Sequence, residues 1–413
     1  MPNKIGKISK KNTRKETNNP GKNEYTHKNI DLPAEIALYY GFNISEIPTI
    51  TKEDIKKSHS ICESESHSKE PSDILSKFAL EEKVAILRMY QEKKMENGPQ
   101  PVMLYFGKPI SQESSNHKES GAERSVSLEI IGTQNSISEA ILIQTSLELL
   151  KDEGYSDLEV YINSVGDRDS LNRFTRELSA YYRKNINELP AHCRQLMKKD
   201  LWGVLSCKNE KCRIIKNEAP KSMNFLSESS RIHFKEVLEY LEILEIPYEI
   251  DNFLVGNKAF SCETIFEIHN PASLAECKPL AVGIRYANIA KKLGLKRDLP
   301  GIGVHLTFKE TDERKNIKFL RPKIYFIQLG AEAKLKSLKI IEILRKEKIS
   351  LYQAISRDKL ISQLGMAESM KTPYTIIMGQ KEALENAVIV RNMKNHSQET
   401  IKICDLPKYL KKL

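Results

Sequence analysis

The sequence predicts a chain of the α+β class that ends in a separate, small α/β domain. Before residue 320, strand patterns such as the alternation at 158–162 are interrupted by a long helical, charged stretch from 169 to about 245. After the run RPKIYFIQLG at 321–330, strands and helices alternate, which favours a mostly parallel sheet. With 413 residues, 40% of them hydrophobic, the chain can form two or three domains with a sizeable core.

The first 30 residues hold eight Lys or Arg against two Glu and very few apolar side chains. Such a segment cannot bury enough surface to order itself, so we expect a disordered basic tail over 1–30. The tail could contact RNA or serve only as a solubilising leader.

Hydrophobic periodicity then predicts the remaining elements in order. Helices are expected at 34–39, 80–94 and 138–150, with polar loops at 60–75 and 110–125. In the C-terminal domain we expect helices at 333–348, 357–370 and from Leu406, and strands at 349–355, 374–378 and 388–390.

Composition narrows the function classes. The net charge of +10 and the isoelectric point near 9.0 are compatible with a nucleic-acid partner. Seven scattered cysteines favour reduced thiols in the cytoplasm over a disulfide framework. No apolar run approaches 18 residues and no hydrophobic signal segment opens the chain, so we expect no membrane partner.

Several stretches resemble bacterial histidyl-tRNA synthetases. LEVYINSVGDRDS (158–170) is similar to a strand and loop of that family, PAHCRQLMKKDLWGVLSCKNEKCRIIKNEAPK (190–221) to its helical insertion, and HFKEVLEYLEILEIPYEIDNFLV (233–255) to the segment before its histidine-specific loop. FIQLGAEAKLKSLKIIEILRKEKI and YTIIMGQKEALENAVIVRNMKNHSQETI resemble its anticodon-binding domain. The resemblance covers roughly residues 31–413.

This resemblance implies a class II aminoacyl-tRNA synthetase-like antiparallel sheet core over 31–320, with a helical insertion at about 169–248. It also implies a C-terminal α/β anticodon-binding domain over 321–413. Enzymes of the family activate histidine with ATP and Mg²⁺, charge tRNA, and generally act as homodimers. We therefore expect tRNA or another RNA as partner, and a homodimer.

The arginines that the family needs are missing at the matching positions. They stabilise a pentavalent phosphate that carries extra negative charge. In the second family motif, a run like Phe-Arg-Tyr-Glu-Arg, the matching residues place Ser111 at an arginine and keep only Glu113. In the third motif, Glu310 falls where an arginine should contact ATP.

The run GNKAFS at 256–261 matches Arg-Gly-Leu-Asp-Tyr-Tyr of the family. Gly256 stands at the catalytic arginine and Ala259 at the aspartate. The run matching Leu-Arg-Pro-Glu-x-Thr keeps the carboxylate of Glu81 but has Lys83 at the threonine. Of the Gly-Gly-Arg-Tyr run, Arg285 and Tyr286 remain.

Losing one oxyanion donor costs about 3 kcal/mol of barrier. We therefore assign no catalytic residue and expect aminoacylation to be lost or severely reduced, with ATP and Mg²⁺ as cofactors only if activity is retained. One alternative is an active histidine–tRNA ligase in which Lys108, Lys258 or Lys309 compensates. Another is a non-catalytic regulatory subunit, as in ATP phosphoribosyltransferase, although that subunit normally lacks the anticodon-binding domain.

The C-terminal runs are nearly intact. They suggest these tRNA-binding candidates at the edge of its sheet: Gln363, Gln380, Glu382, Arg391 and Gln398. The alternative is that these runs only preserve the fold. Cys207 and Cys212 could form half of a metal site, but no second pair follows at zinc spacing, so we expect no metal.

Overall fold

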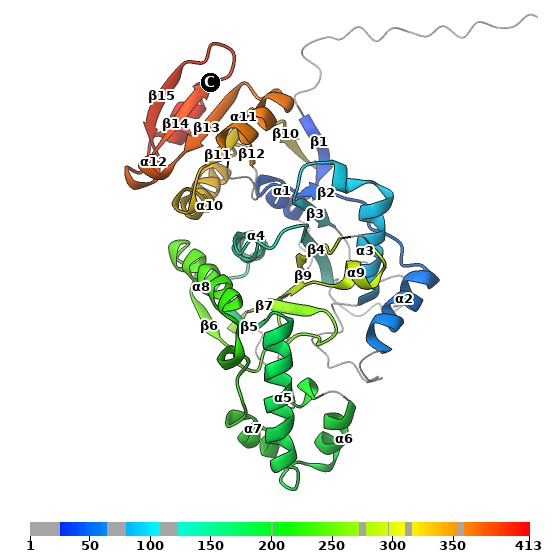
Figure 1. Ribbon diagram of the computed structural model, residues 1–413. Helices are drawn as coiled ribbons and strands as arrows, with labels where there is room; N and C mark the ends of the chain where they lie inside the picture. Colours follow the sequence, from blue (N-terminus) through cyan, green and yellow to red (C-terminus); the bar gives the residue numbers. More distant parts are fainter. Residues whose placement is uncertain are drawn as a thin grey trace, which may run out of the picture.

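The computed structural model contains a large and a small β-sheet, with helices packed against both (Figure 1). It describes residues 25–63, 80–107, 123–199, 201–205, 207, 209–271, 278–295, 297–309, 316–353 and 359–413. The large sheet has the spatial order β2 (Asn43–Ile44), β3 (Val102–Phe106), β4 (Glu123–Ile131), β9 (Gly301–Lys309), β8 (Ala281–Tyr286), β7 (Ser261–His269), β5 (Glu159–Gly166), β6 (Tyr248–Ile250). Its five inner pairings are antiparallel and only the two edge strands pair in parallel. The expected antiparallel core is confirmed.

The two faces of this sheet differ because side chains alternate along each strand. On β4, Val126, Leu128 and Ile130 belong to the main apolar core. The residues between them, Ser125, Ser127 and Glu129, are also buried but polar. Helices α4 (Ile137–Asp152) and α8 (Glu228–Ile243) pack against each other and against the apolar side of the sheet. The other side is the polar face on which a site can be built.

The expected helices of the core are present, but an unexpected helix at Lys52–Glu63 overlaps the start of the polar loop expected at 60–75. The expected helices at 34–39, 80–94 and 138–150 are confirmed as α1 (Leu32–Tyr39), α3 (Leu80–Glu92) and α4. Two more, α2 (Lys52–Glu63) and α9 (Ile289–Lys292), pack against α3. The helical insertion, seen at the bottom of Figure 1, contains α5 (Arg168–Lys184), α6 (Ala191–Lys199), η3 (Trp202–Val204) and α7 (Glu210–Asn217). Two short 3₁₀ turns, η2 (Met95–Asn97) and η4 (Ser222–Phe225), complete this part.

Side-chain caps fix where the insertion begins and ends. Asp167 accepts a hydrogen bond from the backbone N–H of Ser170 and starts α5, and Ser227 does the same for Ser230 at the start of α8. The two caps also bond to each other, because the hydroxyl of Ser227 donates to Asp167 (2.7 Å). Both ends of the inserted segment are thereby held at one point beside the large sheet.

The C-terminal sheet has the order β12 (Leu351–Gln353), β11 (Ile324–Gln328), β13 (Tyr374–Met378), β14 (Ala387–Asn392), β15 (Gln398–Lys402). Its helices are α10 (Ala331–Lys346), α11 (Leu360–Ser369), α12 (Gln380–Leu384) and α13 (Leu406–Leu410). The expectation of a mostly parallel sheet needs correction: β11 pairs in parallel with two strands, but β13–β14 and β14–β15 are antiparallel. For β14 and β15 the reason is the short turn that joins them and reverses the chain.

The basic tail was expected to extend to residue 30, and this too needs correction. Residues 25–30 form β1, which pairs with β10 (Ile317–Leu320) in a two-stranded antiparallel sheet. Residues 1–24 lie outside the described part of the chain. In that described part, no helix combines the length and apolar character needed to cross a membrane.

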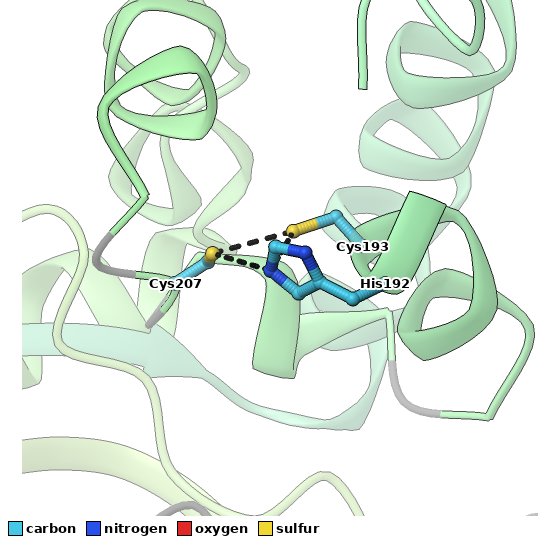
Figure 2. Close-up of side chains that lie close together, drawn as sticks. All are labelled: His192, Cys193 and Cys207. Carbon is cyan, nitrogen blue, oxygen red and sulfur yellow. Dashed lines mark hydrogen bonds between the residues drawn. The ribbon is translucent and has the colours of Figure 1, made fainter. Parts of the chain in front are cut away.

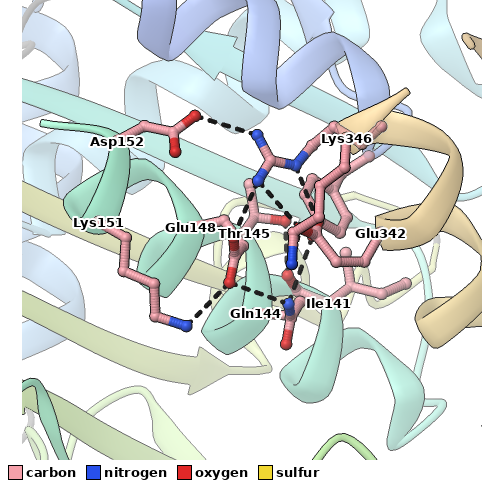
Figure 3. A network of polar contacts seen from close by, with 10 residues as sticks. Ile141, Gln144, Thr145, Glu148, Lys151, Asp152, Glu342 and Lys346 are labelled. Atoms are coloured by element: carbon pink, nitrogen blue, oxygen red, sulfur yellow. Dashed lines mark hydrogen bonds and ion pairs between the residues drawn. The ribbon is translucent and has the colours of Figure 1, made fainter. Parts of the chain in front are cut away.

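A buried polar network joins the C-terminal domain to the large sheet's helices (Figure 3). Arg345 of α10 is bonded to Glu148 (2.8 Å) and Asp152 (3.1 Å) of α4. On its own helix it also contacts Glu342 (2.8 Å), which accepts a hydrogen bond from the hydroxyl of Tyr40 (2.5 Å). Burial would lower the pKa of Arg345, but these carboxylates raise it well above its ordinary value. The two parts of the protein are therefore joined by charge as well as by the continuous apolar core.

Candidate functional site

The turn at 256–261 is closed by its own side chains. The hydroxyl of Ser261 accepts a hydrogen bond from the backbone N–H of Asn257 (2.7 Å), and the Asn257 side chain accepts one from the N–H of Ala259 (2.9 Å). A Cβ atom at Gly256 would lie 2.6 Å from the Cβ of Ser261, so this conformation has no room for a side chain there. Phe260 is buried in the apolar cluster that contains α3 and α9. An arginine at 256 could not enter this turn unless the turn opened.

The polar face of the sheet carries a buried cation–carboxylate–phenol cluster. Lys83 of α3 forms an ion pair with Glu129 of β4, and the hydroxyl of Tyr286 donates to the other oxygen of Glu129 (2.9 Å). Gly303 faces Glu129 in the register of β4 and β9, and a Cβ atom there would lie 2.6 Å from the carboxyl carbon. Gly301 leaves room for the Tyr286 ring in the same way. The two glycines are needed for space on this face of the strand.

Arg285 lies on the opposite face of the sheet from Tyr286. Because successive side chains of a strand point to opposite sides, the guanidinium of Arg285 faces α4. There it forms two bonds with Glu139 (2.5 and 2.6 Å) and also donates to the backbone carbonyls of Thr133 (3.0 Å) and Asn135 (3.2 Å). His233 of α8 is 2.8 Å from Glu139. All these partners belong to the protein itself, so Arg285 stabilises the interior of the fold.

The electrostatics of Glu139 follow from this geometry. Burial alone would raise the pKa of its carboxyl group, but the charges of Arg285 and His233 lower that pKa to about 2. Glu139 is therefore ionised at neutral pH although its side chain is fully buried.

A second polar feature lies beside the closed turn. A cavity of about 360 Å³ is lined by residues of the turn and by four basic side chains: Arg168, Lys258, Lys291 and Lys292. The ammonium of Lys292 donates to the carbonyl of Ala259 in the turn (3.2 Å). Cys262 also lines the cavity, and burial raises the pKa of its thiol to about 12, which argues against a nucleophilic thiolate. The four basic side chains that line the cavity favour the binding of an anion there.

The remaining positions that matched family motifs do not belong to the buried cluster around Glu129. Glu81, on α3, accepts a hydrogen bond from the hydroxyl of Ser58 (3.1 Å) and so contacts α2. Ser111, Glu113 and Glu310 lie outside the described residues.

Sequence reasoning missed three residues of the polar face: Lys83 as a partner, Glu129, and His305, whose ring lies 3.2 Å from the hydroxyl of Ser127. The signal that could have found them is strand alternation. Polar residues at every second position of 125–129 face alternate residues of 303–307 across one antiparallel pair.

Glu129 and Glu139 do not fit a magnesium ion. Hard divalent cations need free carboxylate oxygens. The two buried carboxylates described above, Glu129 and Glu139, already face Lys83 and Arg285. We derive no catalytic step through such an ion.

The predicted RNA-binding residues separate into two groups. Gln363 is fully buried, and its amide group exchanges hydrogen bonds with the backbone of Gln328 (2.8 and 3.1 Å), so RNA cannot reach it in this structure. Glu382 accepts from the backbone N–H of Gly379 (3.0 Å) and caps α12. These two contacts favour structural roles.

The other three candidates are more accessible. Arg391 and Gln398 are direct neighbours across β14 and β15, and Arg391 approaches His396 in the connecting turn (3.2 Å). Gln380 is exposed at the start of α12. The hairpin edge around Arg391 is therefore the candidate nucleic-acid interface.

Comparisons with known proteins agree with this architecture. Residues 323–413 match the family described as "Anticodon binding domain". A crystal structure of apo S. aureus histidyl-tRNA synthetase has a TM-score of 0.50 at 23% identity and covers 92% of this chain and 93% of its own. The antiparallel sheet, the helical insertion and the C-terminal domain are those of a class II aminoacyl-tRNA synthetase.

Sequence relatives agree with this structural comparison. The histidine–tRNA ligase of Halothermothrix orenii is 28% identical over 338 residues, covering 80% of each chain. That of Lysinibacillus sphaericus is 26% identical over 413 residues, covering 95% of this chain and 96% of its own. The chain is therefore similar to histidine–tRNA ligases over most of its length, and its residues 323–413 match an anticodon-binding domain.

Proposed function

We propose that this protein binds tRNA or a related RNA and that its aminoacylation activity is lost or severely reduced. The observation that supports the proposal best is the closed turn at 256–261. Gly256 stands where the family has an arginine, and the turn is completed by hydrogen bonds of Ser261 and Asn257.

The interior charges support the same conclusion. Lys83, at the position of a family threonine, places an ammonium on Glu129, so this buried carboxylate is already neutralised from within. Two unit charges 4 Å apart interact by about 4 kcal/mol at an effective dielectric constant near 20. A cationic group of a substrate would have to replace an ammonium that the chain itself supplies.

The C-terminal domain supports RNA binding. Its anticodon-binding match is continuous from 323 to 413. The hairpin edge presents Arg391 beside His396, with Lys394 exposed in the turn between the strands. Together with the net charge of +10, this edge suits a polyanion.

The first experiment is histidine-dependent ATP–pyrophosphate exchange. We expect exchange at least a hundredfold below that of the Lysinibacillus sphaericus histidine–tRNA ligase assayed in parallel, because one lost oxyanion donor alone costs roughly that factor. Exchange at a comparable rate would instead establish an active ligase with displaced catalytic groups.

The second experiment is a gel-shift titration with tRNA at several salt concentrations. We expect affinity to fall steeply with salt, and Arg391→Gln to weaken binding and reduce the salt slope by about one. Lys57→Gln is the matched control, since it removes one exposed positive charge from α2. Equal weakening by both variants would contradict a specific interface at the hairpin, and absence of binding at low salt would contradict RNA binding.

We further propose a cytoplasmic location and a homodimer, as in the family. Sedimentation of the purified chain tests the second point. Co-purification with a catalytic phosphoribosyltransferase would instead favour the regulatory-subunit alternative.

A further inference from the structure

Four potential metal ligands meet in the helical insertion, away from the polar face of the sheet. His192 and Cys193 lie at the start of α6, Cys207 follows η3, and Cys212 lies in the first turn of α7. The sequence indicated only Cys207 and Cys212 as half of a site, because the other two residues precede them by 14 residues or more. Folding of the insertion brings His192 and Cys193 next to Cys207 (Figure 2), and Cys193 also contacts Cys212.

The ligand atoms of His192, Cys193 and Cys207 lie within 4.8 Å of one another, and Cys212 joins them through its contact with Cys193. The sulfur of Cys193 lies 3.3 Å from that of Cys207 and 2.9 Å from that of Cys212. The Nε2 atom of His192 lies 3.0 Å from the sulfur of Cys193 and 3.4 Å from that of Cys207. Tetrahedral zinc with bonds near 2.3 Å to sulfur separates its ligand sulfurs by about 3.7 Å, so small side-chain adjustments would admit the ion.

We propose that His192, Cys193, Cys207 and Cys212 bind one structural Zn²⁺ ion. Three thiolates and one imidazole form a common structural zinc set, and four protein ligands leave no open position for a substrate. This site would replace our expectation of no metal. It does not depend on whether the protein charges tRNA.

The surroundings of the cluster support a structural ion. The backbone N–H of Asn209 donates to the sulfur of Cys207, which is the kind of outer contact that orients a thiolate ligand. The ammonium of Lys216 donates a hydrogen bond to the carbonyl of Leu205 (3.3 Å), just before Cys207. It also interacts electrostatically with Cys212, so its positive charge can offset part of the charge of three thiolates.

The insertion also has a physical need for such an ion. Its segments α6, η3 and α7 contain only 9, 3 and 8 residues, which is too short for independent stability. They are held by a small apolar cluster that contains Cys193, Cys212 and Trp202. Metal ligation is a common way to stabilise a module with so small a core.

The test is the metal content of the full-length chain, purified without chelators. We expect one zinc per chain, and replacement by Co²⁺ should give the visible absorption of tetrahedral cobalt with a thiolate charge-transfer band. Cys193→Ser and Cys212→Ser should reduce the zinc content from one to near zero. Cys404→Ser, at an exposed cysteine outside the cluster, is the matched control and should keep one zinc.

Trp202 provides a second readout, since it is the single tryptophan of the chain, is buried, and shares the apolar cluster. Removing the metal by chelation should shift its emission to longer wavelength, and added zinc should restore it. His192→Ala keeps all three thiols and should lose zinc to a weak chelator that the wild type resists. This variant tests the site even if the serine variants fail to fold.

Three results would overturn the proposal. The first is a metal-free chain with all thiols free, and the second is a Cys193–Cys212 disulfide seen as a mass lower by two hydrogens with no metal. The third is zinc that remains bound in both serine variants, which would place the ion elsewhere.

Discussion

Replacing Arg285 by methionine should destabilise the protein strongly, because it leaves Glu139 charged and buried without its main partner. The guanidinium makes two bonds to this carboxylate, at 2.5 and 2.6 Å. These contacts, with His233, lower the pKa of Glu139 from 4.5 to about 2 despite burial. At about 1.4 kcal/mol per pKa unit, the shift corresponds to about 3 kcal/mol. Breaking a buried pair costs about 3–5 kcal/mol, so the two values agree.

Urea unfolding followed by circular dichroism measures this effect. Because the folded pKa of Glu139 lies below the unfolded one, its stabilisation is fully present above about pH 4.5 and is lost as pH falls toward 2. In Arg285→Met, burial should instead raise the pKa of this carboxyl. The deficit should therefore be largest at neutral pH and shrink as the solution is acidified toward pH 2.

The double variant Arg285→Met/Glu139→Leu separates charge from packing. It removes both charges together, so we expect it to recover most of the loss seen in the single variant. A single variant within 1 kcal/mol of the wild type, or a double variant no more stable than the single one, would refute the structural role assigned to Arg285.

Three further substitutions test the site. Gly303→Ala places a methyl group against Glu129 and should cost about 1–3 kcal/mol in thermal unfolding, whereas unchanged stability would show that the carboxylate can move away. Ser261→Ala removes the acceptor for the N–H of Asn257 and should cost about 1–3 kcal/mol, detectable as faster hydrogen exchange of that amide; unaltered exchange would show that the turn is held in another way. Gln363→Ala should lower the unfolding temperature of the C-terminal domain without changing the salt slope of tRNA binding, and a changed slope would restore Gln363 as an RNA contact.

The sequence predicted what depends on local pattern. Helix α4 and strand β13 were expected within one or two residues of where they lie, because their apolar periodicity is strong. Strand β15 was missed because QETIK has one buried residue in five, and its pairing with β14 comes from the turn and not from hydrophobicity.

The site was less predictable, because its chemistry depends on contacts between distant residues. The positions of Gly256 and Tyr286 followed from a resemblance, but nothing near residue 129 indicates that its partner is Lys83, 46 residues earlier. Likewise, His192 and Cys207 became neighbours only through the packing of short helices, which sequence spacing alone does not show. The strand register shows why Arg285 and Tyr286, adjacent in sequence, serve opposite faces of the sheet.

The Arg345 network has a consequence for how the whole molecule moves. A C-terminal domain attached only by a linker could reorient freely and would bind its ligand independently of the large sheet. Here such a reorientation would separate Glu148 and Asp152 from Arg345 and expose apolar side chains of the shared core. A polyanion bound at the β14–β15 hairpin would therefore keep a fixed orientation relative to the large sheet. Truncation before α10 would leave Asp152 without Arg345, and Glu148 with its ion pair to Lys151.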